Sequence, residues 1–106
     1  MTDYPAELAF QINAVHLPAP EREYRFHETR RWRFDLAMQQ YQFKLAVEID
    51  GGGFVNGRHS RGKGIEADCE KFAEAAILGW VVLRVTPRQV KNGQALTWIE
   101  RWWGAR

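Results

Sequence analysis

The sequence predicts an α/β fold in which helices flank a mixed central sheet, with elements in the order α-β-β-β-α-β-α. Residues 32–38 and 43–49 alternate apolar with polar side chains, as half-buried strands do. Residues 80–86 are almost continuously apolar, which is typical of a central strand covered on both faces. A helix is expected between the last two of these strands, and a helical crossover implies that the strands it joins are parallel.

Length and composition limit what the chain can be. Its 106 residues suffice for one domain, 1–106, and its 45% hydrophobic content argues against disorder. No apolar run reaches the roughly 18 residues that span a bilayer, so we expect no membrane partner. No basic and apolar leader opens the sequence, and Cys69 alone cannot form an internal disulfide, so we expect a cytoplasmic protein. The net charge is only +2, but basic residues cluster in 22–33 and 58–63, which suits a polyanionic partner.

The first helix is predicted over 5–15, because Pro5 suits a helix start and Leu8, Ile12 and Val15 follow at helical spacing. Residues 22–26 predict an edge or half-buried strand. In 32–38 one face is expected to hold Trp32, Phe34, Leu36 and Met38, and the other Arg33, Asp35 and Ala37. In 43–49 the apolar face is expected to hold Phe43, Leu45, Val47 and Ile49, opposite Lys44, Ala46, Glu48 and then Asp50.

The pairing of these two strands decides where the acidic side chains meet. Matching the apolar faces puts Asp35 and Glu48 on one polar face. A tight turn at Gln39 and Gln40 would place Asp35 opposite Lys44. A wider turn over about 39–44 places it opposite Glu48, within ~5 Å, a repulsive pairing that a bound cation relieves. We predict the wider turn.

The second half of the chain begins with the glycine-rich, basic segment GGGFVNGRHSRGKG (51–64), which predicts an irregular loop. A helix is expected from near Ile65 to Gly79, where glycine suits the residue after a helix end. Residues 80–86 predict the central strand, which Pro87 closes. The last helix is predicted over 95–103, where Leu96, Ile99 and Trp103 share one side.

These segments resemble the PD-(D/E)xK nuclease superfamily. RRWRFDLA, LAVEIDGG, GRHSRG and GWVVLRVTP are similar to small endonucleases related to the very-short-patch repair nuclease and the domain-of-unknown-function 559 proteins, including short phage-encoded members. The resemblance covers about residues 21–90. It implies a restriction-endonuclease-like core and hydrolysis of DNA phosphodiesters that depends on Mg²⁺ or Mn²⁺.

By motif matching, the resemblance makes Asp35 and Glu48 the two metal-binding acids. The superfamily's lysine, expected two residues after Glu48, is replaced by Asp50. A cationic or imidazole group elsewhere must then act on the water and the developing charge, and the candidates are Lys71, Lys63 and His59. Asp50 becomes a candidate third metal ligand.

Two further sets of residues follow from this hypothesis. Glu7, on the first helix, is a candidate fourth carboxylate for the metal, as in some members of the superfamily. In the glycine-rich segment, residues 51–53, including Gly52, would let the backbone approach a DNA strand, and Arg58, Arg61 and Lys63 would bind flanking phosphates. No base-reading motif is present, so we expect structure-selective or weakly sequence-selective cleavage.

Two alternative functions remain open, and the role of the C-terminal tryptophans is a separate question. The chain could be an inactive nuclease fold that only binds DNA or a protein, since the lysine of the motif is missing. It could be a zinc-linked nuclease using His16, His27, His59 and Cys69, although their spacing fits no tetrahedral motif. Trp98, Trp102 and Trp103 could stack on bases, but their spacing favours packing, and the apolar strip at Trp102 and Trp103 leaves a homodimer open.

Overall fold

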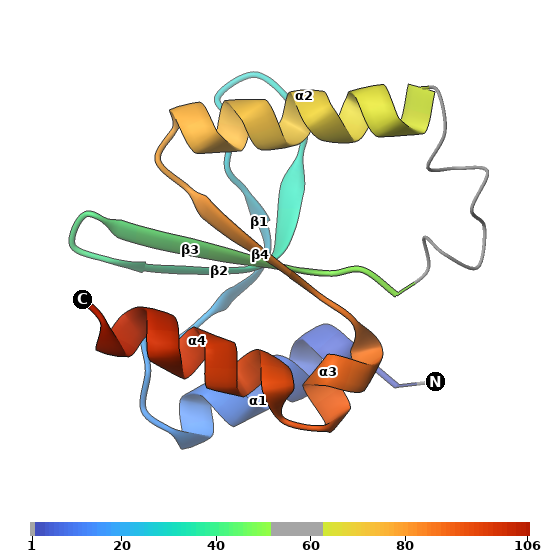
Figure 1. Ribbon diagram of the computed structural model, residues 1–106. Helices are drawn as coiled ribbons and strands as arrows, with labels where there is room; N and C mark the ends of the chain where they lie inside the picture. The colour runs from blue at the N-terminus through green and yellow to red at the C-terminus, as the bar shows by residue number, and fades with distance from the viewer. Residues whose placement is uncertain (1, 52–62) are drawn as a thin grey trace.

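The computed structural model describes residues 2–51 and 63–106. The chain forms an α/β domain in which helices cover both faces of a four-stranded mixed sheet (Figure 1). The strands are β1 (Glu21–Arg25), β2 (Arg33–Gln40), β3 (Phe43–Ile49) and β4 (Val81–Val85). The helices are α1 (Tyr4–Ala14), α2 (Lys63–Ile77), α3 (Pro87–Lys91) and α4 (Gln94–Gly104). The predicted α/β class is confirmed, and the short α3 is an addition to the expected order.

The sheet has the strand order β1-β2-β3-β4. The first three strands form an antiparallel meander, and β4 returns through α2 to lie parallel to β3, as predicted. β4 is nevertheless at an edge of the sheet formed by the described residues, so its prediction as a central strand was wrong. Its apolar sequence is explained by the helices, because α2 lies over one face of the sheet and α4 over the other (Figure 1). Burial of both faces therefore does not require a strand on both sides.

The β2–β3 hairpin has the predicted register but a different turn. Leu36 pairs with Val47, and the same offset places Asp35 opposite Glu48. The expected wide turn over 39–44 was wrong, because the ladder continues to the pair Gln40 and Phe43 and the chain reverses over only two residues. Tyr41 has a φ of 57°, the left-handed conformation that tight hairpin turns use and that glycine or asparagine usually signals.

Two apolar clusters lie on the two sides of the sheet. Leu36, Met38, Leu45 and Val47 pack with α1, α3 and α4, whereas Ala37 and Ala46 pack with Ala75 of α2 and with Trp80. Phe34 belongs to the second cluster, so the prediction that it shares a face with Leu36 was wrong. The alternation breaks at Asp35, and Glu23, which the register places opposite it, has a left-handed φ of 49°.

Local sequence signals fix the helix ends next to the sheet. The side chain of Asp3 accepts a hydrogen bond from the N–H of Ala6 and caps α1. Gly79, with a φ of 90°, follows α2 and lets Trp80 N–H donate to the carbonyl of Ala75, which closes the helix as glycine commonly does. Within the described ranges, the helices are too short or too polar to cross a bilayer.

Candidate active site

Asp35 and Glu48 lie side by side where β2 and β3 separate. The carboxylate of Glu48 accepts a hydrogen bond from the backbone N–H of Asp35 at 3.0 Å. The carboxylate of Asp35 accepts one from the backbone N–H of Ile49 at 2.7 Å. Each acid thus binds the backbone of the opposite strand just beyond the last ladder pair, Leu36 and Val47. The two side chains are fixed in place by the sheet, which is what a preorganised ligand pair requires.

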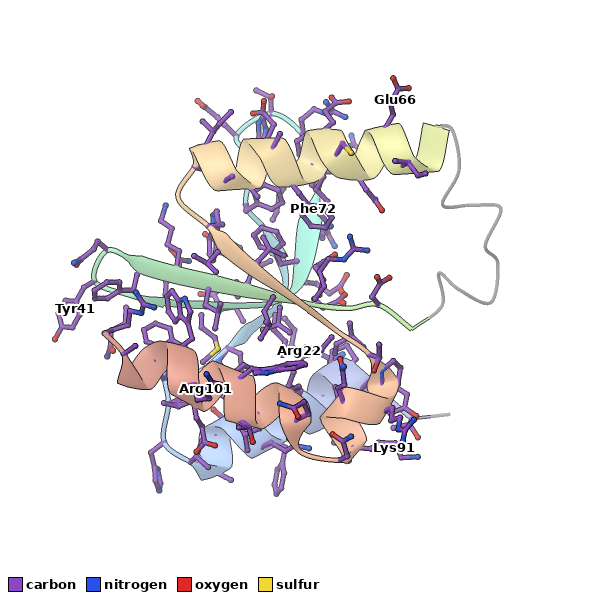
Figure 2. All side chains as sticks on the ribbon, viewed as in Figure 1. Arg22, Tyr41, Glu66, Phe72, Lys91 and Arg101 are labelled. Carbon is purple, nitrogen blue, oxygen red and sulfur yellow. The ribbon has the colours of Figure 1, made fainter. Side chains whose placement is uncertain are left out.

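Lys71 of α2 reaches the same point from the helical layer. Its ammonium group donates to Glu48 Oε2 at 3.0 Å and to the carbonyl of Arg33 at 2.8 Å. The ammonium also lies 5.8 Å from the ring centre of Phe34 and 5.5 Å from that of Phe72. Phe72 lies between α2 and the sheet in Figure 2. These contacts hold the ammonium group of Lys71 against the carboxylate of Glu48.

Burial sets the electrostatics of this group. The Glu48 side chain is 18% exposed and that of Lys71 is 16% exposed. Loss of water around the carboxylate raises the pKa of Glu48 above its ordinary value, and the nearby charge of Asp35 acts in the same direction. The charge and hydrogen bond of Lys71 and the N–H of Asp35 oppose this rise without cancelling it. An additional cation at this point would therefore favour the ionised form of Glu48.

Asp50 has a different partner. It follows β3, and its carboxylate accepts a hydrogen bond from Arg84 of β4 at 2.6 Å. The parallel register pairs Glu48 with Arg84, so this guanidinium lies on the strand next to the acids. Sequence reasoning missed Arg84 as a site residue. The alternation in WVVLRVT could have assigned it to a face, but only the offset between β3 and β4 brings it to Asp50.

A hollow opens beside Asp35. It lies between the start of α1, the end of β3 and Pro87, and it is lined in part by Tyr4, Ile49 and Gly51. A Cβ atom on Gly51 would lie 2.5 Å from Cγ of Pro87, so the chain can pass here only with glycine. The first of the three consecutive glycines is thereby explained by packing against the start of α3.

The remaining predicted residues stand apart from this group or outside the description. Glu7 lies one helical turn after Tyr4, which lines the hollow. Its Oε2 is buried without a hydrogen-bond partner among the described residues. Lys63 is the first residue of α2. Gly52, Arg58, His59 and Arg61 lie outside the residues that the structure describes.

The described residues contain no cluster that matches the zinc site of the alternative hypothesis. His27 is held by Glu74 at Nε2 and by the N–H groups of Thr29 and Arg30 at Nδ1, which makes it a structural link between the β1–β2 loop and α2. In residues 2–51 and 63–106, no three His, Cys, Asp or Glu side chains gather as a metal site would require. Two carboxylates, those of Asp35 and Glu48, are the acids that the described structure brings together beside Lys71.

Comparison with known proteins adds no relative, since no family model, curated protein or solved structure matches the chain.

Proposed function

We propose that the protein is an endonuclease that hydrolyses DNA phosphodiesters with the help of Mg²⁺ or Mn²⁺, on a restriction-endonuclease-like core. The observation that carries the proposal is the meeting of Asp35 and Glu48 at the open end of the β2–β3 hairpin, with Lys71 bonded to Glu48. The resemblance of the sequence to the PD-(D/E)xK superfamily supports the same assignment. The antiparallel meander followed by a helix and a parallel strand agrees with that core.

The donor chemistry fits a hard divalent cation. Asp35 and Glu48 supply carboxylate oxygens, and Mg²⁺ is usually held by one or two carboxylates together with water and substrate phosphate. Burial raises the pKa of Glu48, which means that its ionised form is poorly solvated. A bound cation would stabilise that ionised form in place of the lost water. Asp35 and Glu48 would hold the ion, and Asp50 and Glu7 remain predicted additional ligands. When bound, the ion supplies a Lewis acid that polarises the phosphodiester and acidifies water.

Lys71 takes the place of the missing motif lysine in this proposal. An ammonium group has three N–H donors, and Glu48 and the carbonyl of Arg33 accept two of them. The third donor is left for a phosphate oxygen or the attacking water. Its positive charge would stabilise the negative charge that develops on the phosphate, in a site where burial strengthens such interactions.

DNA binding would come mainly from residues around the site. Arg58, Arg61 and Lys63 of the glycine-rich segment are proposed to contact phosphates on either side of the cleaved bond, and Gly52 to allow close approach of the backbone. Because these contacts would be electrostatic, affinity should fall steeply as salt rises.

The experiment is cleavage of supercoiled plasmid and of branched DNA by the purified protein in Mg²⁺, Mn²⁺ or EDTA. We expect cleavage that needs the metal, that is lost in Asp35→Asn and Glu48→Gln, and that falls at least ~100-fold in Lys71→Met. Asp68→Asn, on an exposed position of α2, is the matched control and should cleave normally. Cleavage in EDTA, or by Asp35→Asn at the normal rate, would refute the proposal.

A binding-only role is the second candidate. The pairing of Asp50 with Arg84 favours it, because Asp50, which stands where the motif has its lysine, binds a guanidinium in the described structure instead of adding a metal ligand. Its signature is salt-sensitive DNA binding without cleavage under any metal condition. That result would mean that Asp35 and Glu48 belong to a nuclease fold that no longer hydrolyses DNA.

A further inference from the structure

The edge of the sheet at β4 borders a groove on the side opposite the proposed active site. The groove has a volume of about 580 Å³ and runs between β4 and α4. Its walls are mainly apolar and include Val81, Leu83, Trp98 and Trp102. Val81 is 46% exposed, which is unusual for an aliphatic side chain in a strand next to the core.

Among residues 2–51 and 63–106, no strand pairs with the outer edge of β4, which leaves its backbone groups available along this groove. The carbonyl of Val85 faces β3, where it accepts from the N–H of Asp50. Because the N–H and C=O groups of alternate residues point to opposite sides of a strand, those of Val82 and Arg84 face away from β3. An exposed edge of this kind is a template for an additional strand.

The groove is also strongly basic. Arg84, Arg101 and Arg106 line it, and its described lining includes no Asp or Glu. Arg101 projects from α4 in Figure 2. The guanidinium of Arg84 points to the other face of the sheet, where it binds Asp50 and lies 5.1 Å from the ring centre of Phe72. The guanidinium groups on the α4 side are therefore those of Arg101 and Arg106, and an apolar channel bordered by these two suits a ligand that carries both apolar side chains and carboxylates.

The same details argue against two other occupants. Arg106 stacks on Trp102 with its guanidinium carbon 4.2 Å from the ring centre, which occupies a face that a nucleic-acid base would need. A second copy of the chain would bring Arg101 and Arg106 of the two grooves together, and like charges at an interface are unfavourable.

We propose that the open edge of β4 and the groove beside it bind an extended, acidic segment of a partner protein. The segment adds a strand through the backbone groups of Val82 and Arg84. Because successive side chains of a strand point to opposite faces of the sheet, every second side chain of the segment faces the groove. Of these, the apolar ones lie against Val81 and Leu83, and the carboxylates meet Arg101 and Arg106. The proposal does not rest on the nuclease activity proposed above.

The test uses a fluorescein-labelled seven-residue peptide, Val-Thr-Val-Thr-Glu-Thr-Glu, whose Val and Glu side chains share one face of a strand, and binding is followed by anisotropy. We expect Arg101→Glu/Arg106→Glu to weaken binding at least ~10-fold, since two attractive contacts become repulsive. Arg88→Glu/Lys91→Glu on α3 makes the same change in net charge away from the groove and should leave affinity unchanged. Bound peptide should slow hydrogen exchange at the amides of Val82 and Arg84.

Controls separate strand addition from simple charge attraction. A peptide with proline in place of valine lacks the backbone donors of a strand and should bind at least ~10-fold more weakly. Equal affinity of the Arg101→Glu/Arg106→Glu protein would overturn the proposal. So would tighter binding of a single-stranded oligonucleotide of equal charge, or a dimer of the free protein that this double variant dissociates.

Discussion

Two acid–cation pairs lie at the end of β3, only two residues apart in sequence, and they differ in burial. In the pair of Glu48 with Lys71, the side chains are 18% and 16% exposed. In the pair of Asp50 with Arg84 they are 45% and 46% exposed. The nitrogen–oxygen distances are 3.0 Å in the first pair and 2.6 Å in the second, so contact length alone would rank the exposed pair as the stronger.

Burial reverses that ranking. Water screens the exposed pair, and such pairs contribute little to the free energy of unfolding. Around Glu48 the lost solvation raises the pKa even with Lys71 in contact, so this carboxylate depends on its cation. The two pairs show that a poorly solvated carboxylate, here that of Glu48, is the one whose ionisation depends on a neighbouring cation. Asp50 is exposed enough for water to take the place of Arg84.

The largest effect is expected from Lys71→Met. It leaves Glu48 buried without its cation, which should lower the free energy of unfolding at pH 7 by about 1–3 kcal/mol. The loss should shrink at pH 4, because a protonated Glu48 needs no partner. Chemical denaturation at both pH values measures it, with Lys91→Met as the control at an exposed lysine of α3 (Figure 2). An equal loss at pH 4 and pH 7 would show that Lys71 acts only by packing.

A smaller effect, with a distinct pH dependence, is expected from Glu48→Gln. A raised pKa means that the folded protein binds the Glu48 proton more tightly than the unfolded chain does. The resulting stabilisation is complete below the ordinary pKa of 4.5 and is lost as pH rises through the folded pKa. The melting temperature of the variant relative to the wild type should therefore be higher at pH 7 than at pH 4, by roughly a few degrees.

Thermal melts of both proteins across this pH range provide the measurement. Glu66→Gln, at an exposed position on the outer side of α2 in Figure 2, is the matched control. If the melting temperatures of the wild type and Glu48→Gln changed with pH in the same way, the burial of Glu48 would not raise its pKa in the folded protein.

The sequence predicted the part of the site that local patterns determine. The alternation in residues 43–49 predicted the bounds of β3. Matching apolar faces left two registers open, and the one predicted, with Asp35 opposite Glu48, is the one observed, although it was reached through a turn that was too wide. Lys71 could be named as a candidate from its place on a helix. Its contact with Glu48 required the packing of α2 over the sheet, which no local pattern specifies.

Longer-range geometry explains what the sequence could not predict. The hairpin turn was predicted too wide, and Tyr41 adopts a left-handed conformation there without the glycine or asparagine that usually signals a tight turn. The run 80–86 looked central because it is apolar on both faces, but helices supply that burial. Arg84 reaches Asp50 only through the offset of two parallel strands joined by a long crossover.

The smallest effect is expected from Asp50→Asn, which removes the charge of the exposed pair. The free energy of unfolding should fall by less than about 1 kcal/mol, because solvent already screens the contact and can hydrate Arg84 after the change. Urea denaturation at low and high salt is the measurement, and added salt should shrink even this difference. A loss as large as that of Lys71→Met would place Asp50 in the same coupled group as Glu48, and the division between a buried and a solvated pair would then be wrong.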